Sequence, residues 1–239
     1  MNGLWVYLSA SPLLWLTATL IAWLVADGLS RAAGRHALVN PVLIAILLLG
    51  GLLWLTDTPY GRYFEGAQFV HFLLGPATVV LAIPLYRNLA LVRRNLLPML
   101  AALAVGSLVA IVSALGIAAA FGVPREVLVS LAPKSVTAGI AMAVSDSLGG
   151  IPSLTAALVI MTGIIGAVLV TPLMNALRIR DYAARGFAVG LASHGIGTAR
   201  AFTVNSVAGV FAGIAMGLNA VVTAILVPVV LRALGWLAH

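Results

Sequence analysis

The feature that most constrains this chain is a set of long stretches without any Asp, Glu, Lys or Arg. Each is long enough for the roughly 20 residues that a helix needs to cross the hydrocarbon core of a bilayer. Charged residues make up 8% of the chain, against about 25% in soluble domains, so water cannot be the solvent for most of its surface. We therefore predict an all-α polytopic membrane protein in a lipid bilayer. The uncharged stretches are residues 4–26, 37–56, 66–86, 95–124, 147–177 and 201–231.

Composition and short motifs exclude several classes of protein. The first apolar stretch follows no basic residue and is interrupted by Trp5, Trp15 and Trp23, so we interpret it as a retained helix rather than a cleaved signal peptide. Cysteine is absent, which excludes a disulfide framework, thiolate metal sites and cysteine nucleophiles. The net charge of +7 comes from arginines spread over short loops, so we expect no nucleic-acid partner. The sequence has no HExxH-type metal spacing and no paired catalytic aspartates, so we expect neither a metal nor enzyme activity.

Arginine-rich loops orient the predicted helices, because short loops with excess arginine face the cytoplasm. Loops 57–65 and 121–126 carry mixed charges and are expected outside. Simple alternation would also place the last arginine-rich loop outside, unless residues 127–146 enter the membrane and return, or break midway, without a net crossing. We therefore predict about seven full crossings plus one re-entrant or broken segment, with the N-terminus outside. The loop arginines are Arg31 and Arg35, then Arg87, Arg93 and Arg94, then Arg178, Arg180 and Arg185.

Two apolar stretches have related sequences. Residues 40–52, NPVLIAILLLGGL, and residues 151–163, IPSLTAALVIMTG, share Pro, Leu, Ala and Leu at matching positions. In the predicted topology these helices cross in opposite directions, as the inverted repeats of secondary transporters do. Chance similarity between Leu- and Ala-rich helices is the alternative. We expect a single transmembrane domain over residues 1–239, with repeats over 1–120 and 121–239.

Three segments combine an apolar sequence with helix-breaking residues: 72–86, 131–142 and 192–202. Proline removes a backbone donor, and glycine lowers helix stability. In lipid, the backbone groups freed by a break need partners in protein or in a water-lined cavity. An interrupted helix also exposes N–H groups at a new N-terminus, which binds anions well. The residues predicted to mark these interruptions are Gly75, Pro76, Thr78, Pro133, Gly195 and Gly197.

Two of the interrupted segments also hold a cation. Lys134 and Arg200 are the cations placed well inside apolar segments, where a charge costs about 2.5–3.5 kcal/mol on insertion-derived scales. The nearby anions are Asp27 and Asp146, both near segment ends, so we expect an external anion to supply the missing charge. Hydroxyl groups accompany both cations and an imidazole accompanies Arg200, and this set of donors suits a small carboxylate. The predicted substrate-binding residues are Lys134, Ser135, Thr137, Ser193, His194, Thr198 and Arg200.

Each of these residues also has a simpler interpretation. Lys134 can extend its stem to the interface or pair with Asp146. Arg200 can lie at the interface, at the end of its helix. His194 can be a neutral histidine that bonds a backbone carbonyl. Ser, Thr and Gly in membrane helices are usually packing residues, so the prediction depends on the clustering of these groups.

The same three segments resemble the signature stretches of the LrgB/CidB family. They read FLLGPATVVLAIPLY at 72–86, LAPKSVT at 131–137 and ASHGIGTARA at 192–201, and the similarity extends from about residue 10 to the C-terminus. The third stretch often has Ala where this chain has Gly195. The second often continues with Thr and Pro where this chain has Ala138 and Gly139, which affects the expected geometry just after Thr137.

The resemblance implies two competing functions. Bacterial members were described as antiholin-like modulators of murein hydrolase export and autolysis that act with a small LrgA/CidA-type membrane partner. Plant relatives resemble the plastidial glycolate/glycerate transporter, and bacterial pairs are linked to pyruvate uptake. Interrupted helices with convergent cations favour transport, because a holin-type pore former needs only oligomerising helices.

We therefore expect a secondary transporter of small monocarboxylates, such as glycolate, glycerate, pyruvate or lactate. Its expected location is the bacterial cytoplasmic (inner) membrane, as a multi-pass protein. Lys134 and Arg200 would neutralise the carboxylate, the hydroxyl groups would bond it, and His194 would bond the substrate or relay a proton. We expect no cofactor beyond a coupling H⁺ or Na⁺, and a homodimer by analogy with other transporters. The alternative is an antiholin-like regulator that works through protein partners.

Overall fold

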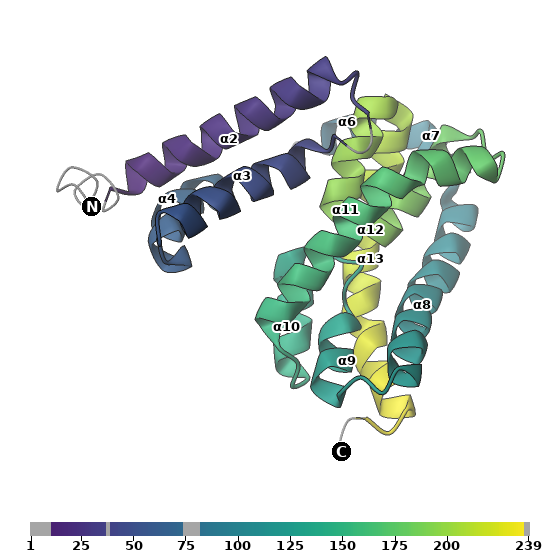
Figure 1. The fold of residues 1–239 in the computed structure, drawn as a ribbon. Helices are drawn as coiled ribbons and strands as arrows, with labels where there is room; N and C mark the ends of the chain where they lie inside the picture. The colour runs from purple at the N-terminus through teal and green to yellow at the C-terminus, as the bar shows by residue number, and fades with distance from the viewer. Residues whose placement is uncertain (1–10, 37–38, 74–81, 237–239) are drawn as a thin grey trace. The chain divides into compact units, whose positions relative to one another are not determined.

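The computed structural model describes residues 11–36, 39–73 and 82–236, which form helices joined by turns (Figure 1). The chain divides into two compact units, residues 1–83 and 84–239, with α6 (Ala82–Arg87) at the division. The first unit contains α2 (Pro12–Ala32), α3 (Pro41–Leu55) and α4 (Tyr60–Phe72). The second contains α7 (Leu89–Arg94), α8 (Leu96–Ala120), α9 (Arg125–Leu131), α10 (Ala138–Ser147), α11 (Pro152–Ala176), α12 (Tyr182–Val204) and α13 (Ser206–Ala233).

In the first unit, α2 packs against both α3 and α4. Gly66 lets α4 approach closely, because a Cβ at that position would lie 2.2 Å from the carbonyl oxygen of Pro12. Thr19 Oγ1 donates to the Tyr63 hydroxyl at 3.2 Å, and the Tyr63 ring lies edge-on to the buried Trp15. This aromatic contact fixes the start of α2 against α4.

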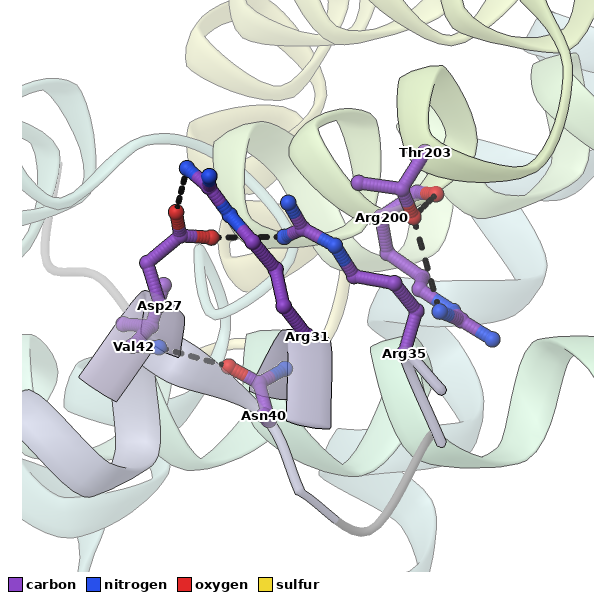
Figure 2. Close-up of polar contacts among 7 residues, drawn as sticks. All are labelled: Asp27, Arg31, Arg35, Asn40, Val42, Arg200 and Thr203. Atoms are coloured by element: carbon purple, nitrogen blue, oxygen red, sulfur yellow. Dashed lines mark hydrogen bonds and ion pairs between the residues drawn. The ribbon is translucent and has the colours of Figure 1, made fainter. Parts of the chain in front are cut away.

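Charged groups of the first unit gather at the end of α2. Asp27 accepts hydrogen bonds from Arg31 and from Arg35, the latter at 2.6 Å (Figure 2). The Asn40 side chain then caps α3 by accepting from the Val42 N–H at 2.8 Å. Asparagine and serine-type residues are favoured at such caps because they satisfy an N–H that has no partner within the helix. The charge of Asp27 is thus balanced within its own unit.

Four of the described helices, α2, α8, α11 and α13, are long and apolar enough to span a bilayer. Their starts follow ordinary helix signals: Pro152 stands at the first turn of α11, and the Asn205 side chain caps α13. Large apolar side chains such as Val105 and Ile117 are exposed on α8, as expected for a surface in lipid. The predicted all-α fold is confirmed for the described residues, but the predicted count of full crossings is not.

The segment that was predicted to re-enter or break, residues 127–146, is not one helix. α9 ends at Leu131, residues 132–137 form turns, and α10 starts at Ala138. After α10, the Ile151 N–H donates to Ser130 Oγ of α9 at 2.7 Å, so the chain has returned to the level of α9 (Figure 1). We call α9, residues 132–137 and α10 the first hairpin, and residues 132–137 its tip. The predicted break is confirmed.

α12 also doubles back, although the sequence predicts only an interruption there. Ser193 and His194 have non-helical backbone, with φ/ψ of −131°/16° and 41°/−134°. Beyond them the chain reverses, because a Cβ on Gly197 would lie 2.9 Å from the carbonyl oxygen of Val189. In a continuous helix these residues would be about 12 Å apart along the axis. We call α12 the second hairpin, Ser193 and His194 its tip, and the helical pieces before and after the tip its first and second arms.

The two hairpins approach α13 from opposite ends. Leu128 of the first hairpin packs with Val227 and Leu231, near the C-terminal end of α13. A Cβ on Gly186 of the second hairpin would lie 2.0 Å from the carbonyl oxygen of Ala208, near the N-terminal end of α13. α13 has 28 residues and is about 42 Å long, so it passes both hairpins.

The helix starts that follow two arginine-rich loops lie at the same end of the second unit. Asn95 and Pro98 at the start of α8 line one cavity together with Asp181 and Ala184 at the start of α12. The positive-inside rule requires both arginine-rich loops to lie on the same side of the membrane. They lie at the same end here because the first hairpin returns to the end from which it started. The cytoplasmic assignment of that end, and the inverted repeats over residues 1–120 and 121–239, stay predictions.

Candidate functional site

The first tip and the end of the first arm of α12 meet at Asn219, which lies near the middle of α13 and is 1% exposed. Its Nδ2 donates to the backbone carbonyl of Ser135 in the first tip at 3.3 Å. The same nitrogen donates to the carbonyl of Leu191, at the end of the first arm of α12, at 2.9 Å. Its Oδ1 accepts from Ser107 of α8 at 2.7 Å and from Thr223 at 3.1 Å. One buried side chain therefore joins both hairpins, α8 and α13.

Each tip lies between the end of one helical piece and the beginning of the next. α10 begins directly after the first tip, and the second arm of α12 begins after His194. The first N–H groups of a helix have no carbonyl partner in their own helix and carry partial positive charge. Gly139, in the first turn of α10, is exposed, and a Cβ there would meet open space among the described residues. This helix N-terminus is therefore accessible to a ligand.

Three predicted residues lie together in or beside the first tip. Lys134, the single lysine of the chain, is half-buried, and its Nζ lies 3.4 Å from Oγ of the buried Ser135. Thr137 is the N-cap residue of α10, but its side chain makes no capping hydrogen bond. The ion pairs found in the described part of the chain do not include one between Lys134 and Asp146. The first tip thus combines a cation with hydroxyl groups and a helix N-terminus.

The predicted residues of the second tip are buried and bonded internally. The His194 ring Nε2 lies 2.9 Å from the backbone carbonyl oxygen of Val159 on α11, which is the simpler interpretation of this histidine. Thr198 Oγ1 donates to the carbonyl of His194 at 2.8 Å. Ser193 packs so closely on α11 that a Cβ on Gly166 would lie 1.6 Å from its Oγ. These contacts fix the second tip against α11.

Arg200 lies away from the tips. Its guanidinium is 3.4 Å from Oγ1 of Thr203, near the end of the second arm (Figure 2). It also lines a small cavity, of about 30 Å³, with Tyr182 and Ala208. Ala208 and Asn219 are about 16 Å apart along α13, so the structure does not bring Arg200 together with Lys134. Its position agrees with the simpler interpretation, an arginine near the end of its helix.

The predicted helix-breaking residues have different positions. Pro133 lies in the first tip and is buried. Gly195 and Gly197 belong to the second arm rather than to the break, and Gly197 permits the close approach to Val189. Among the described residues, no group of three His, Asp or Glu side chains could hold a metal ion. Gly75, Pro76 and Thr78 lie outside the described residues.

The family model that matches this chain is that of the LrgB-like family, over residues 19–233. This chain belongs to the LrgB-like family. It is 38% identical to the uncharacterized protein YwbG of Bacillus subtilis (strain 168) over 80% of this chain and 85% of that protein. It is 34% identical to the holin-like protein CidB of Staphylococcus aureus (strain N315), over 81% of this chain and 84% of that one. No solved structure gives a significant match.

The LrgB-like chain has polar residues at its centre that sequence reasoning did not find. Ser107, Asn219 and Thr223 form a buried network, yet all three are neutral and lie in uncharged stretches of the sequence. Neither their charge nor their helix propensity distinguishes them from the surrounding residues. An amide in the middle of an apolar membrane helix is itself a signal, because polar groups in lipid need partners.

A cavity of about 460 Å³ lies next to this centre, between α8 and the first arm of α12. It begins at Asn95 and Asp181 and ends at Leu191, whose carbonyl Asn219 binds. Its walls are mainly apolar, with Met99 and Phe187 among them. Such walls offer few partners and no cation to a carboxylate, so the polar tips, rather than this cavity, form the candidate site.

Proposed function

We propose that this LrgB-like protein is a secondary transporter of small monocarboxylates, such as glycolate, glycerate, pyruvate or lactate. We place it as a multi-pass protein in the bacterial cytoplasmic (inner) membrane. The observation that supports the proposal is the meeting of two hairpins, from opposite ends of α13, at the buried Asn219. Interrupted helices that meet midway along a membrane-length helix are the usual way in which transporters form a central site.

The opposite entry of the hairpins suits alternating access. A ligand between two such tips is covered from each side by a different hairpin, so a movement of one hairpin opens the site to one side only. A pore former has no need of this arrangement. Movement of one group of helices against another is a common form of the transport cycle.

The charges at the tips favour an anion of small size. Lys134 and the N-terminus of α10 contribute positive charge, and residues 132–137 contain no Asp or Glu. A carboxylate can accept hydrogen bonds from an ammonium group, hydroxyls and backbone N–H groups at once. The hydroxyls of Ser135 and Thr137 are suited to an α-hydroxyl or α-keto oxygen beside the carboxylate. Entry of an anion against the membrane potential requires a coupling cation, for which H⁺ and Na⁺ are the candidates.

Uptake by reconstituted protein tests the proposal. The purified chain in liposomes is expected to take up labelled glycolate or pyruvate with saturation, and Lys134→Gln is expected to lower uptake at least tenfold. Arg200→Gln is the matched control, since it removes one positive charge from the second arm, about 9 Å along that arm from His194 and on the side away from the first tip, and should retain most of the activity. Absence of saturable uptake by folded wild-type protein, with and without an LrgA/CidA-type partner, would contradict the transport function.

A second candidate function has support from the relatives. Two of them, from Staphylococcus aureus and Staphylococcus epidermidis, are named holin-like protein CidB. An antiholin-like regulator of murein hydrolase export and autolysis, acting with an LrgA/CidA-type membrane partner, would explain that name. Such a regulator should tolerate Lys134→Gln in a cell-lysis assay, because its activity would depend on contacts with the partner rather than on a central anion site. A homodimer is compatible with both functions and can be measured on the same purified material.

A further inference from the structure

Asn219 binds one backbone carbonyl from each hairpin at the point where its helix is interrupted. Leu191 stands in the last turn before the reversal at Ser193, so its carbonyl has no N–H partner in a continuing helix. The Leu191 carbonyl belongs to the partially negative C-terminal end of the first arm of α12, and the Ser135 carbonyl lies in the turns between α9 and α10. The two protons of the Asn219 amide therefore satisfy one backbone carbonyl in each interrupted segment.

The orientation of this amide is set by its other partners. Carbonyl oxygens need donors, so the NH₂ group of Asn219 must point toward Ser135 and Leu191. The amide oxygen then accepts hydroxyl protons from Ser107 and Thr223. Three helices of the second unit thus contribute to one network, and each polar atom of the Asn219 side chain is used within it.

This network separates the two kinds of charge at the tips. The Ser135 and Leu191 carbonyls are directed to α13, where the neutral amide of Asn219 covers them. The positive N-terminus of α10 is left accessible at Gly139, with Lys134 nearby. An uncovered carbonyl would repel a carboxylate at the same place, since it presents partial negative charge in a site that excludes water.

We propose that Asn219 is a positioning residue that gives the central site its preference for anions, by binding one backbone carbonyl from each hairpin and leaving the N-terminus of α10 to the substrate. This inference rests on the proposed function of the tips. It assigns a role in substrate binding to a residue that does not itself supply positive charge. It also explains why the chain places an amide, rather than a carboxylate or an apolar side chain, at the centre of α13.

Carboxylate binding by purified protein in nanodiscs tests this inference, because no gradient is present. With glycolate and pyruvate as probes, Asn219→Asp is expected to weaken affinity at least tenfold at pH 7.5, because a carboxylate has no donor for the two carbonyls and adds negative charge. At pH 5 the introduced carboxyl takes up a proton and regains a donor, so the variant should approach wild type measured at the same pH. Asn219→Ala should bind weakly at both pH values, in constant ratio to wild type.

Asn205→Asp is the matched control, because Asn205 caps α13 and aspartate caps a helix equally well. If Asn219→Asp does not fold, Ser107→Ala and Thr223→Val test the same network by removing one hydroxyl that orients the amide, with an expected loss of about threefold each. Folded Asn219→Asp with wild-type affinity at both pH values would overturn the inference while leaving the transport function. Wild-type protein that binds neither carboxylate would contradict the proposed function and this inference with it.

Discussion

The first and second hairpins reach the same asparagine, but different contacts hold them in place. In the first hairpin, Ser130 accepts from the Ile151 N–H at 2.7 Å and donates to the Glu126 carbonyl at 2.6 Å. Thr155 of α11 donates to Ser145 of α10 at 2.7 Å. Directional hydrogen bonds between buried hydroxyls thus tie this hairpin to α11.

The second hairpin is held mainly by close backbone approach at glycines. A Cβ on Gly186 or Gly190 would lie 2.0 or 2.1 Å from the carbonyl oxygen of Ala208 or Ala212 on α13. On α11, Gly163 leaves space for the His194 ring, 2.8 Å from where its Cβ would be. Contacts of this kind depend on volume and have little directional preference. We therefore expect the first hairpin to be sensitive to polarity and the second to size.

The largest expected effect is that of filling a glycine contact in the second hairpin. Gly190→Leu should prevent correct packing of α12 on α13, since even the Cβ meets backbone that cannot move aside. Overpacking of this kind costs about 3 kcal/mol or more, and we expect little monodisperse protein after extraction into detergent. Gly116→Ala on α8 is the control, because a Cβ there meets nothing within 4 Å. Normal thermal stability of Gly190→Ala would show that the two helices are further apart than the structure has them.

A smaller effect is expected from removing a hydroxyl of the first hairpin. Ser130→Ala leaves the Ile151 N–H without its acceptor, which should lower the free energy of unfolding by about 0.5–1.5 kcal/mol. Ser147→Ala removes an exposed hydroxyl that bonds only the nearby Val144 carbonyl, so it should be neutral to within about 0.5 kcal/mol. Thermal denaturation of the two variants in the same detergent makes the comparison. Equal stability of both would mean that the hydroxyls do not hold the first hairpin.

The same contrast explains what the sequence could and could not predict. The break in the first hairpin was predictable, because Pro133 interrupts the helix and the arginine-rich loops require residues 127–146 to return. The reversal of α12 was not, because Ser193 and His194 are not strong helix breakers. Gly195 and Gly197 drew attention to the segment, but glycines in membrane helices also serve close packing, and Gly197 does so here.

The candidate site shows the same limit. Lys134 was found because a charge in an apolar segment is conspicuous, whereas Asn219 was missed because it is neutral. Arg200 was grouped with Lys134 because both are cations in interrupted segments. The reversal of α12 shows that the second arm carries Arg200 away from the tips. The sequence does not show this, because the same number of residues leads to a different place in a reversed helix than in a continuous one.

The smallest effect, and the sharpest test of the second tip, concerns the backbone of His194. Its φ of 41° with ψ of −134° is a conformation suited to glycine, and holding another residue there costs on the order of 1–3 kcal/mol. The hydrogen bond between the His194 ring and the Val159 carbonyl stabilises the fold by roughly 1 kcal/mol and so offsets part of this strain. His194→Gly should therefore stay within about 1 kcal/mol of wild type, and His194→Ala, which keeps the strain and loses the bond, should be less stable than His194→Gly.

At Ala188, an ordinary helical position in the first arm, the order should be the opposite, because glycine in a helix costs about 1 kcal/mol relative to alanine. At each position, the glycine variant is compared with the alanine variant for thermal stability. Greater stability of glycine at position 194 and of alanine at position 188 would report the backbone reversal, whatever the side chain of His194 does in transport. If alanine were the more stable residue at both positions, α12 would continue as a helix through Ser193, and the second hairpin would not exist. Uptake by the two His194 variants separates the remaining role: equal loss in both would assign it to the imidazole, and loss in His194→Ala alone to the shape of the tip.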